Sequence, residues 1–180
     1  LFGGVSQGFR APNLSDLTRL DSARSSEIET PVTDLDPETY LSWEAGARAH
    51  GARWSSELSG YYTAIRNMIV RAPTGRTIDE LDEVTKKNAG RGYVCGVEWR
   101  GSARLAEGWD ARASAGWMTG KVRAYPTSEA ESESDTISRL MPLTGEAALR
   151  WSPTGRFWCE GVLAAADKAS HLSADDERDT

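Results

Sequence analysis

Alternation of apolar with polar residues is the feature that most limits what this chain can fold into. In residues 40–50 the odd positions are apolar, while the even positions are mostly polar, charged or glycine. The same two-residue period recurs in residues 93–100, 109–121 and 144–151. Successive side chains of a β-strand point to opposite faces of a sheet, so each segment is predicted to be a strand with one apolar face. Less regular strands are predicted over residues 1–11, 53–71 and 156–169.

The connections between these strands alternate in length. They are, in order, a long polar segment (12–39), a tight turn (51–52), a middling loop (72–83), a short turn (101–108), an acidic loop (125–139) and a tight turn (152–155). Transmembrane β-barrels keep short turns at the periplasmic end and long loops at the external end. The predicted fold is therefore all-β: an antiparallel up-and-down meander of about seven long strands that forms part of a transmembrane β-barrel.

Composition supports this class and argues against others. Only 39% of the residues are apolar, which is low for a soluble globular domain. No apolar run approaches the roughly 18 residues of a membrane helix, whereas a barrel strand needs only alternation. The net charge of -6 argues against nucleic acid as a partner.

Tryptophan placement points in the same direction. Five of the seven tryptophans lie near the predicted short turns: Trp54, Trp99, Trp109, Trp151 and Trp158. Indole rings favour the membrane–water interface, so these residues are expected to form a periplasmic aromatic girdle. The alternative is chance placement beside the turns of a soluble sheet, because aromatic residues favour strands in any case.

Charged residues gather on the other face of the predicted strands. They are Glu44, Arg48, Glu98, Arg100, Arg112, Glu146, Arg150 and Glu160. In a barrel these side chains would line a wet lumen or pack against a plug, and opposite charges on neighbouring strands would form salt-bridge ladders. The simpler alternative is that they form the solvated face of a soluble sheet.

No catalytic, cofactor or metal site is expected. His50 and His171 lack a serine or cysteine partner in a nucleophile motif, and no phosphate-binding loop is present. The acidic run of Glu129, Glu131, Glu133 and Asp135 lacks the glycine and the spacing of a calcium loop. The chain is therefore not predicted to be an enzyme, and no residue stands out as a ligand contact.

Two further pairs of residues, one of lysines and one of cysteines, allow a structural or a functional interpretation. Lys86 and Lys87 are read first as a solubilising strand start, with contact to anionic lipopolysaccharide as the alternative. Cys95 and Cys159 match no metal or redox spacing. They lie three strands apart in the predicted meander, about 14 Å, so they are expected to be free thiols.

Six short segments resemble one family in the order that the family has them. They are SQGFRAPNLSDL (6–17), SWEAG (42–46), YYTAIRNMI (61–69), NAGRGYVCGVE (88–98), LMPLTG (140–145) and SADDERD (173–179). Together they resemble the barrel of TonB-dependent outer-membrane receptors. The resemblance implies a barrel of about 22 strands, of which this chain supplies roughly a third.

The resemblance also implies a function and partners. Residues 1–180 are expected to be a partial barrel without a plug domain or energy-coupling box, and both ends are interpreted as cuts. The intact protein would take up a scarce nutrient such as a ferric siderophore across the outer membrane of a Gram-negative bacterium. Its partners would be its own plug domain, the TonB energy-transducing complex, outer-membrane lipid and an unknown small molecule. The alternatives are a non-energised channel, an autotransporter barrel and a soluble secreted β-rich binding module.

Overall fold

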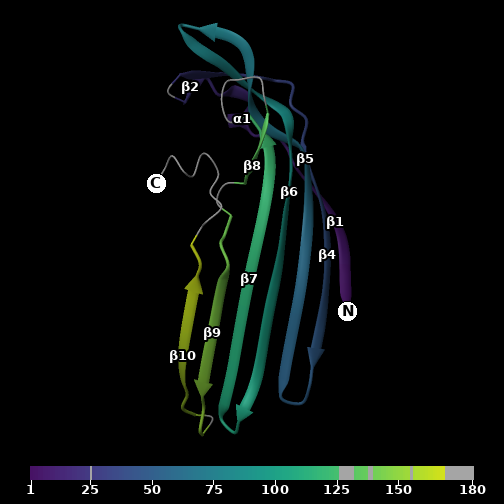
Figure 1. Ribbon diagram of the computed structural model, residues 1–180, viewed down its shortest axis with the longest axis vertical. Helices are drawn as coiled ribbons and strands as arrows, with labels where there is room; N and C mark the ends of the chain where they lie inside the picture. The colour runs from purple at the N-terminus through teal and green to yellow at the C-terminus, as the bar shows by residue number, and fades with distance from the viewer. Residues whose placement is uncertain (25, 126–131, 138–139, 155, 169–180) are drawn as a thin grey trace.

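The computed structural model describes residues 1–24, 26–125, 132–137, 140–154 and 156–168, and the long strands among them form one antiparallel sheet (Figure 1). Neighbouring strands follow the order β1-β4-β5-β6-β7-β9-β10. Their bounds are β1 Phe2–Arg10, β4 Glu38–His50, β5 Trp54–Ile78, β6 Leu81–Ala106, β7 Trp109–Ala124, β9 Thr144–Trp151 and β10 Cys159–Ala166. The predicted all-β meander is confirmed, and the sheet is open rather than closed.

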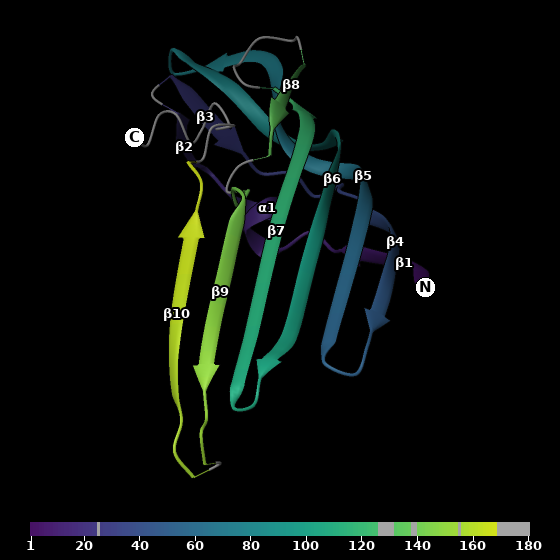
Figure 2. The ribbon, with the colours of Figure 1, turned by 60° about the horizontal axis from the view of Figure 1, so that its bottom comes forward.

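The long and short connections lie at opposite ends of the sheet, as predicted. The turns after β4, β6 and β9 meet at the lower end in Figures 1 and 2, and the longer segments gather at the upper end. Gly108 has a φ of 72°, which permits the tight turn between β6 and β7. These two ends are called the short-turn end and the long-loop end below.

Two predicted connections are wrong because the strands continue through them. The expected loop 72–83 is the tip of the β5–β6 hairpin, which turns at Asp79 and Glu80 with φ values of 50° and 67°. Both central residues of such a turn have positive φ, which matches the twist of the strands beside it. Similarly, β6 extends to Ala106, so the short turn expected over 101–108 is only residues 107–108.

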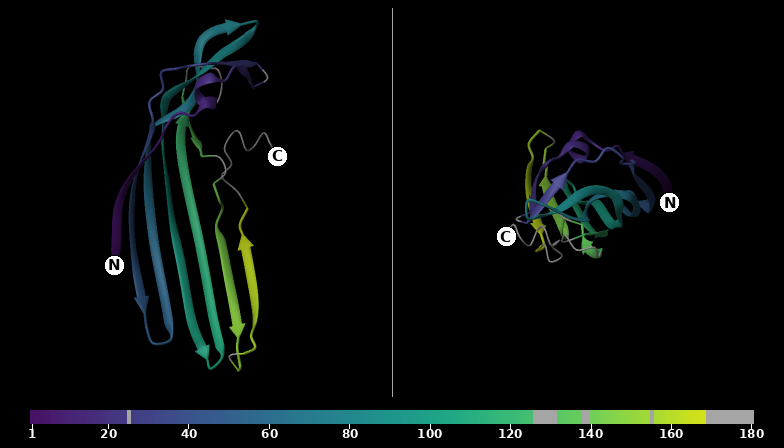
Figure 3. Two further views of the ribbon diagram at one scale, coloured as in Figure 1. Left: turned by 180° about the vertical axis from the view of Figure 1, so that it is seen from behind. Right: turned by 90° about the horizontal axis from the view of Figure 1, so that it is seen from above.

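The long polar segment 12–39 is not a bare loop. It contains α1 (Leu14–Thr18), β2 (Asp21–Arg24) and β3 (Glu27–Thr30), and β3 adds to the upper part of β6 in parallel. A capping box begins α1: the Asn13 side chain accepts from the Asp16 amide, and the Asp16 carboxylate accepts from the Asn13 amide. Seen from above, the sheet curves around the side on which α1 lies (Figure 3). A further short strand, β8 (Glu133–Thr136), pairs with β7.

The buried core is confined almost entirely to the long-loop end. Its apolar members there are Ile65, Ile69, Val70, Ala72 and Val84. Lower down, most large apolar side chains are exposed, and no second sheet or helix layer covers them among the described residues. None of the described helical segments has the length and apolar character to cross a membrane.

Candidate functional site

The pairing register divides the sheet into an apolar face and a polar face. Trp43 lies opposite Tyr62, and Val97 lies opposite Trp117, so the apolar side chains of successive strands share one face. Their exposure is high: Trp43 is 42% and Trp54 is 49% exposed. A soluble sheet would cover such a face, whereas lipid accepts it because the backbone groups are already paired between strands.

Aromatic rings mark two levels on the apolar face. Near the short-turn end, the ring of Trp151 lies 6.0 Å from that of Trp109 and 6.4 Å from that of Phe157. Higher up, Tyr62 lies 6.0 Å from Trp43 and stacks on Tyr93 at 5.5 Å. The second group, Trp43, Tyr62 and Tyr93, is called the upper aromatic belt below.

The predicted girdle is wrong for two of its five tryptophans. Trp99 lies further up the sheet beside Leu58, and its Nε1 donates to Ser56 Oγ at 3.0 Å. Trp158 packs under the Arg150 guanidinium at 4.5 Å, and Arg150 belongs to the polar face. The short turn is narrower than the sequence suggested, which explains why Trp99 lies away from it.

Salt bridges cross the polar face. Arg48 of β4 and Arg100 of β6 both bind Glu57 of β5, the second with Nη2–Oε1 at 2.5 Å. Arg112 of β7 binds Glu160 of β10 through two hydrogen bonds of 2.5 and 2.9 Å. These pairs form two ladders, one across β4, β5 and β6 around Glu57 and one across β7, β9 and β10 around Arg112. They confirm the predicted salt bridges for five of the eight charged residues: Arg48, Arg100, Arg112, Glu146 and Glu160.

Glu57 at the centre of the first ladder was not predicted, and the prediction is wrong for three residues. Glu57 lies directly opposite both Arg48 and Arg100, which only the register reveals. By contrast, Glu44, Glu98 and Arg150 form no ion pair with any described residue. Above the ion pairs, Glu44 and Glu98 thus carry carboxylates without an ion pair among the described residues.

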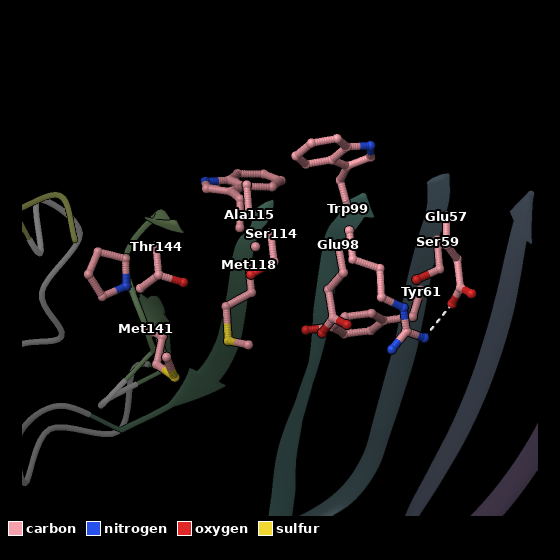
Figure 4. A pocket seen from close by; sticks show the side chains of 14 residues that line it. Glu57, Ser59, Tyr61, Glu98, Trp99, Ser114, Ala115, Met118, Met141 and Thr144 are labelled. Atoms are coloured by element: carbon pink, nitrogen blue, oxygen red, sulfur yellow. Dashed lines mark hydrogen bonds and ion pairs between the residues drawn. The ribbon is translucent and has the colours of Figure 1, made fainter. Parts of the chain in front are cut away.

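The Glu98 carboxylate borders a hollow of about 360 Å³. Figure 4 shows Tyr61 and Glu98 on neighbouring strands at one side of it, with Met118 and Met141 at the other. An acidic group, a phenol and two thioethers in one hollow can bind a cation or a hydrogen-bond donor. This hollow is the best candidate binding site among the described residues.

A charged cluster ties the segment 12–37 to the top of the sheet. Arg10 of β1 donates to both carboxylate oxygens of Glu38, at 2.7 and 3.0 Å, and to Asp16 of α1 at 2.8 Å. The Glu38 carboxylate also accepts from Tyr40 Oη at 2.5 Å and from the Ile69 amide at 2.8 Å.

The cluster keeps Glu38 ionised. Glu38 lies beyond the upper aromatic belt, on the side of the long-loop end. Burial raises its pKa, but the hydrogen bonds from Arg10, Tyr40 and Ile69 outweigh this and hold the pKa at about 2. Arg10 lies on the polar face and binds Asp16 of α1, and α1 lies on the inner side of the curved sheet (Figure 3). The polar face is therefore the concave face of the sheet.

Two more contacts hold the same segment. The Asn88 side chain donates to the carbonyl oxygens of Asp36 and Asn67, at 2.7 and 2.8 Å, and accepts from the Asp36 amide at 2.7 Å. Glu29 of β3 is only 1% exposed and lies 3.6 Å from Lys86 Nζ. Lys86 therefore faces a buried carboxylate rather than solvent, while Lys87 is exposed.

The remaining candidates form no catalytic or metal site within the described part of the chain. His50 ends β4, and no described cluster of histidine, cysteine or acidic residues could hold a metal ion. His171, Glu129 and Glu131 lie outside the described residues, while Glu133 and Asp135 lie on β8. Cys95 and Cys159 are both free, as predicted.

Comparison with known proteins identifies the family. Residues 1–176 match the model of the family described as "TonB dependent receptor-like, beta-barrel". The chain belongs to the TonB-dependent receptor family. No curated protein sequence matches it significantly.

Solved TonB-dependent receptors share the fold. One, titled "Copper transporter OprC", aligns with a TM-score of 0.69 and 15% identity over 94% of this chain and 24% of its own. Another, the siderophore receptor PirA from Pseudomonas aeruginosa, aligns with a TM-score of 0.54 and 20% identity over 95% of this chain and 34% of its own. This chain thus spans about a quarter of the length of the first receptor and about a third of the second, and both are outer-membrane β-barrels of Gram-negative bacteria.

Proposed function

We propose that this chain is a section of the barrel wall of an outer-membrane receptor that imports a scarce nutrient, such as a ferric siderophore, by energy-coupled transport. The observation that carries the proposal is the match to the receptor barrel family over residues 1–176. The two faces of the sheet support it, since the apolar face suits lipid and the polar face suits a wet lumen.

The barrel section would act as a wall and a vestibule rather than as the moving part. The ladder around Glu57 fixes the wall, while the hollow beside Glu98 faces the lumen. The segment 12–37 crosses the mouth, held by Glu38 and Asn88. In the parent protein a plug domain would fill the lumen, and the TonB complex would displace it so that the ligand can pass.

Uptake measurements on the parent protein test this proposal. A Gram-negative host that lacks its own siderophore receptors is given the parent gene and a radioactively labelled ferric siderophore. We expect accumulation that depends on the gene, on TonB and on the proton gradient of the inner membrane. Entry of siderophore at the same rate without TonB would contradict energy coupling and favour a passive channel.

A second candidate cargo is a soft metal ion. Two of the three methionines of the chain, Met118 and Met141, line the hollow together with Glu98. Thioether sulfur favours Cu(I), and one receptor of similar fold is titled a copper transporter. Copper accumulation in the same host, compared between the parent and its Met118→Leu/Met141→Leu variant, separates the two cargoes. Only a copper receptor would lose uptake in this variant while keeping its barrel.

A further inference from the structure

A row of cations continues the apolar face beyond the upper aromatic belt. Lys121 lies directly opposite Tyr93, and two residues further along the strands Arg91 lies directly opposite Arg123. Arg66 continues the same face on β5, and Lys87 lies further out on β6. All five side chains are exposed. We call Arg66, Arg91, Lys121 and Arg123 the outer basic patch.

The pairing of Arg91 with Arg123 is unfavourable by itself. Like charges directly opposite each other on neighbouring antiparallel strands destabilise a sheet. None of the four patch residues has an acidic partner among the described residues. By contrast, Arg48, Arg100 and Arg112 on the polar face are each paired with a glutamate. The part of the chain that the structure describes thus supplies no counter-charge for the patch, so a negative charge from the surroundings would stabilise the sheet.

The level of the patch indicates where that charge lies. Tyrosine and tryptophan rings settle at the boundary between lipid tails and headgroups. Strands rise about 3.4 Å per residue, so Arg91 and Arg123 lie about 7 Å beyond Tyr93 along the strands. The patch is thus placed among the headgroups, on the face that the barrel turns to lipid.

We propose that the outer basic patch binds the phosphate groups of a phosphorylated lipid in the outer leaflet. This inference rests on the membrane placement in the proposed function, but not on the cargo. Guanidinium groups suit the task because their planar forks bind phosphate oxygens in pairs. The lipid would neutralise Arg91 and Arg123 and thereby remove their mutual repulsion, so that the barrel would be more stable with the lipid than without it.

Binding of diphosphorylated lipid A to the purified parent receptor tests the proposal. The probe is a nanodisc of equal parts phosphatidylcholine and diphosphorylated lipid A, and native mass spectrometry counts the lipid A that stays on the protein. Each patch cation near an anionic surface contributes about 1 kcal/mol, so Arg91→Gln/Arg123→Gln should weaken retention about thirty-fold. The matched control is Arg53→Gln/Arg156→Gln, which removes the same charge from exposed arginines at the short-turn end and should retain lipid A normally.

Thermal unfolding in lipid-free detergent provides the second measurement. There the Arg91→Gln/Arg123→Gln variant should unfold at the same or a higher temperature than the parent, because a like-charge pair is gone. Added lipid A should raise the unfolding temperature of the parent but not of the variant. Equal retention by parent and variant, or equal stabilisation by inorganic phosphate and by lipid A, would overturn the proposal. Neither measurement involves the transported nutrient. A negative result would therefore overturn lipid binding by the outer basic patch without contradicting the proposed nutrient uptake.

Discussion

Arg10 and Glu38 lie directly opposite each other on β1 and β4, and two parallel hydrogen bonds join the guanidinium to the carboxylate. The same carboxylate accepts from the Ile69 amide of β5, just past the irregular pairing between Ile65 and Met68. One buried carboxylate therefore links three strands and satisfies a backbone donor at the bulge.

Replacing Glu38 should loosen this junction. Glu38→Ala removes two of the hydrogen bonds of Arg10, which keeps only Asp16, and leaves the buried Ile69 amide without its acceptor; this should cost about 3 kcal/mol. Urea unfolding of the parent receptor, followed by tryptophan fluorescence, measures the loss. Glu44→Ala is the control, because Glu44 forms no ion pair with a described residue. An equal effect of both variants would show that the hydrogen bonds of Glu38 add nothing to the free energy of unfolding.

Acid should weaken the same junction. The pKa of Glu38 is about 2 in the folded chain, below its ordinary value of 4.5. A group with a lowered folded pKa stabilises the fold fully above its unfolded pKa, and this contribution disappears as pH falls through the folded pKa. Stability of the parent should thus fall between about pH 4.5 and pH 2, and Glu38→Gln should flatten that part of the curve. Identical slopes for the two proteins would refute the linkage.

Asn88 should control how tightly the segment 12–37 is held at the long-loop end of the sheet. Asn88→Ala removes three hydrogen bonds to Asp36 and Asn67. Hydrogen exchange at residues 31–37 should then become faster, by about tenfold for each 1.4 kcal/mol lost. Asn88→Asp keeps an acceptor for the Asp36 amide but loses both donors, so its exchange should be intermediate. Unchanged exchange in Asn88→Ala would mean that other contacts hold the segment.

Much of the sheet could be predicted because side-chain direction follows residue parity. Once residues 40–50 are a strand, Trp43 and Glu44 must lie on opposite faces, and the structure has them so. Parity also predicts the face of Arg48 and Arg100 correctly. Their partner Glu57 was not recognised, because the match depends on the register of three strands rather than on any local pattern.

Residue parity does not predict the extension of the β5–β6 hairpin. Residues 72–83 contain Pro73, Gly75 and several charged residues, which indicate a loop. Beyond the membrane both faces of a strand can be polar, so the alternation disappears. The hairpin persists through buried Ala72 and Val84 and through the hydrogen bond from Thr74 to Glu83, contacts that only the folded register creates.

The two cysteines should remain reduced in the folded receptor. Cys95 lies on β6 and Cys159 at the start of β10, and both are free. Alkylation in denaturant without reductant should therefore add two labels to this part of the parent chain, as read by mass spectrometry. Finding a Cys95–Cys159 crosslink in tryptic peptides would require a different strand order, since a disulfide needs Cα atoms within about 7 Å.

The isolated 180-residue chain should not form pores. Among the described strands, β1 and β10 each pair on one side only, which leaves two open edges. Unpaired backbone groups are costly in hydrocarbon, and only a closed barrel removes both edges. Liposomes that receive the isolated chain should show no discrete conductance and no swelling in sugar solutions, whereas a closed porin of similar mass provides the positive control. Discrete pores from the chain would mean that its copies close a barrel together, with β10 of one copy paired to β1 of the next.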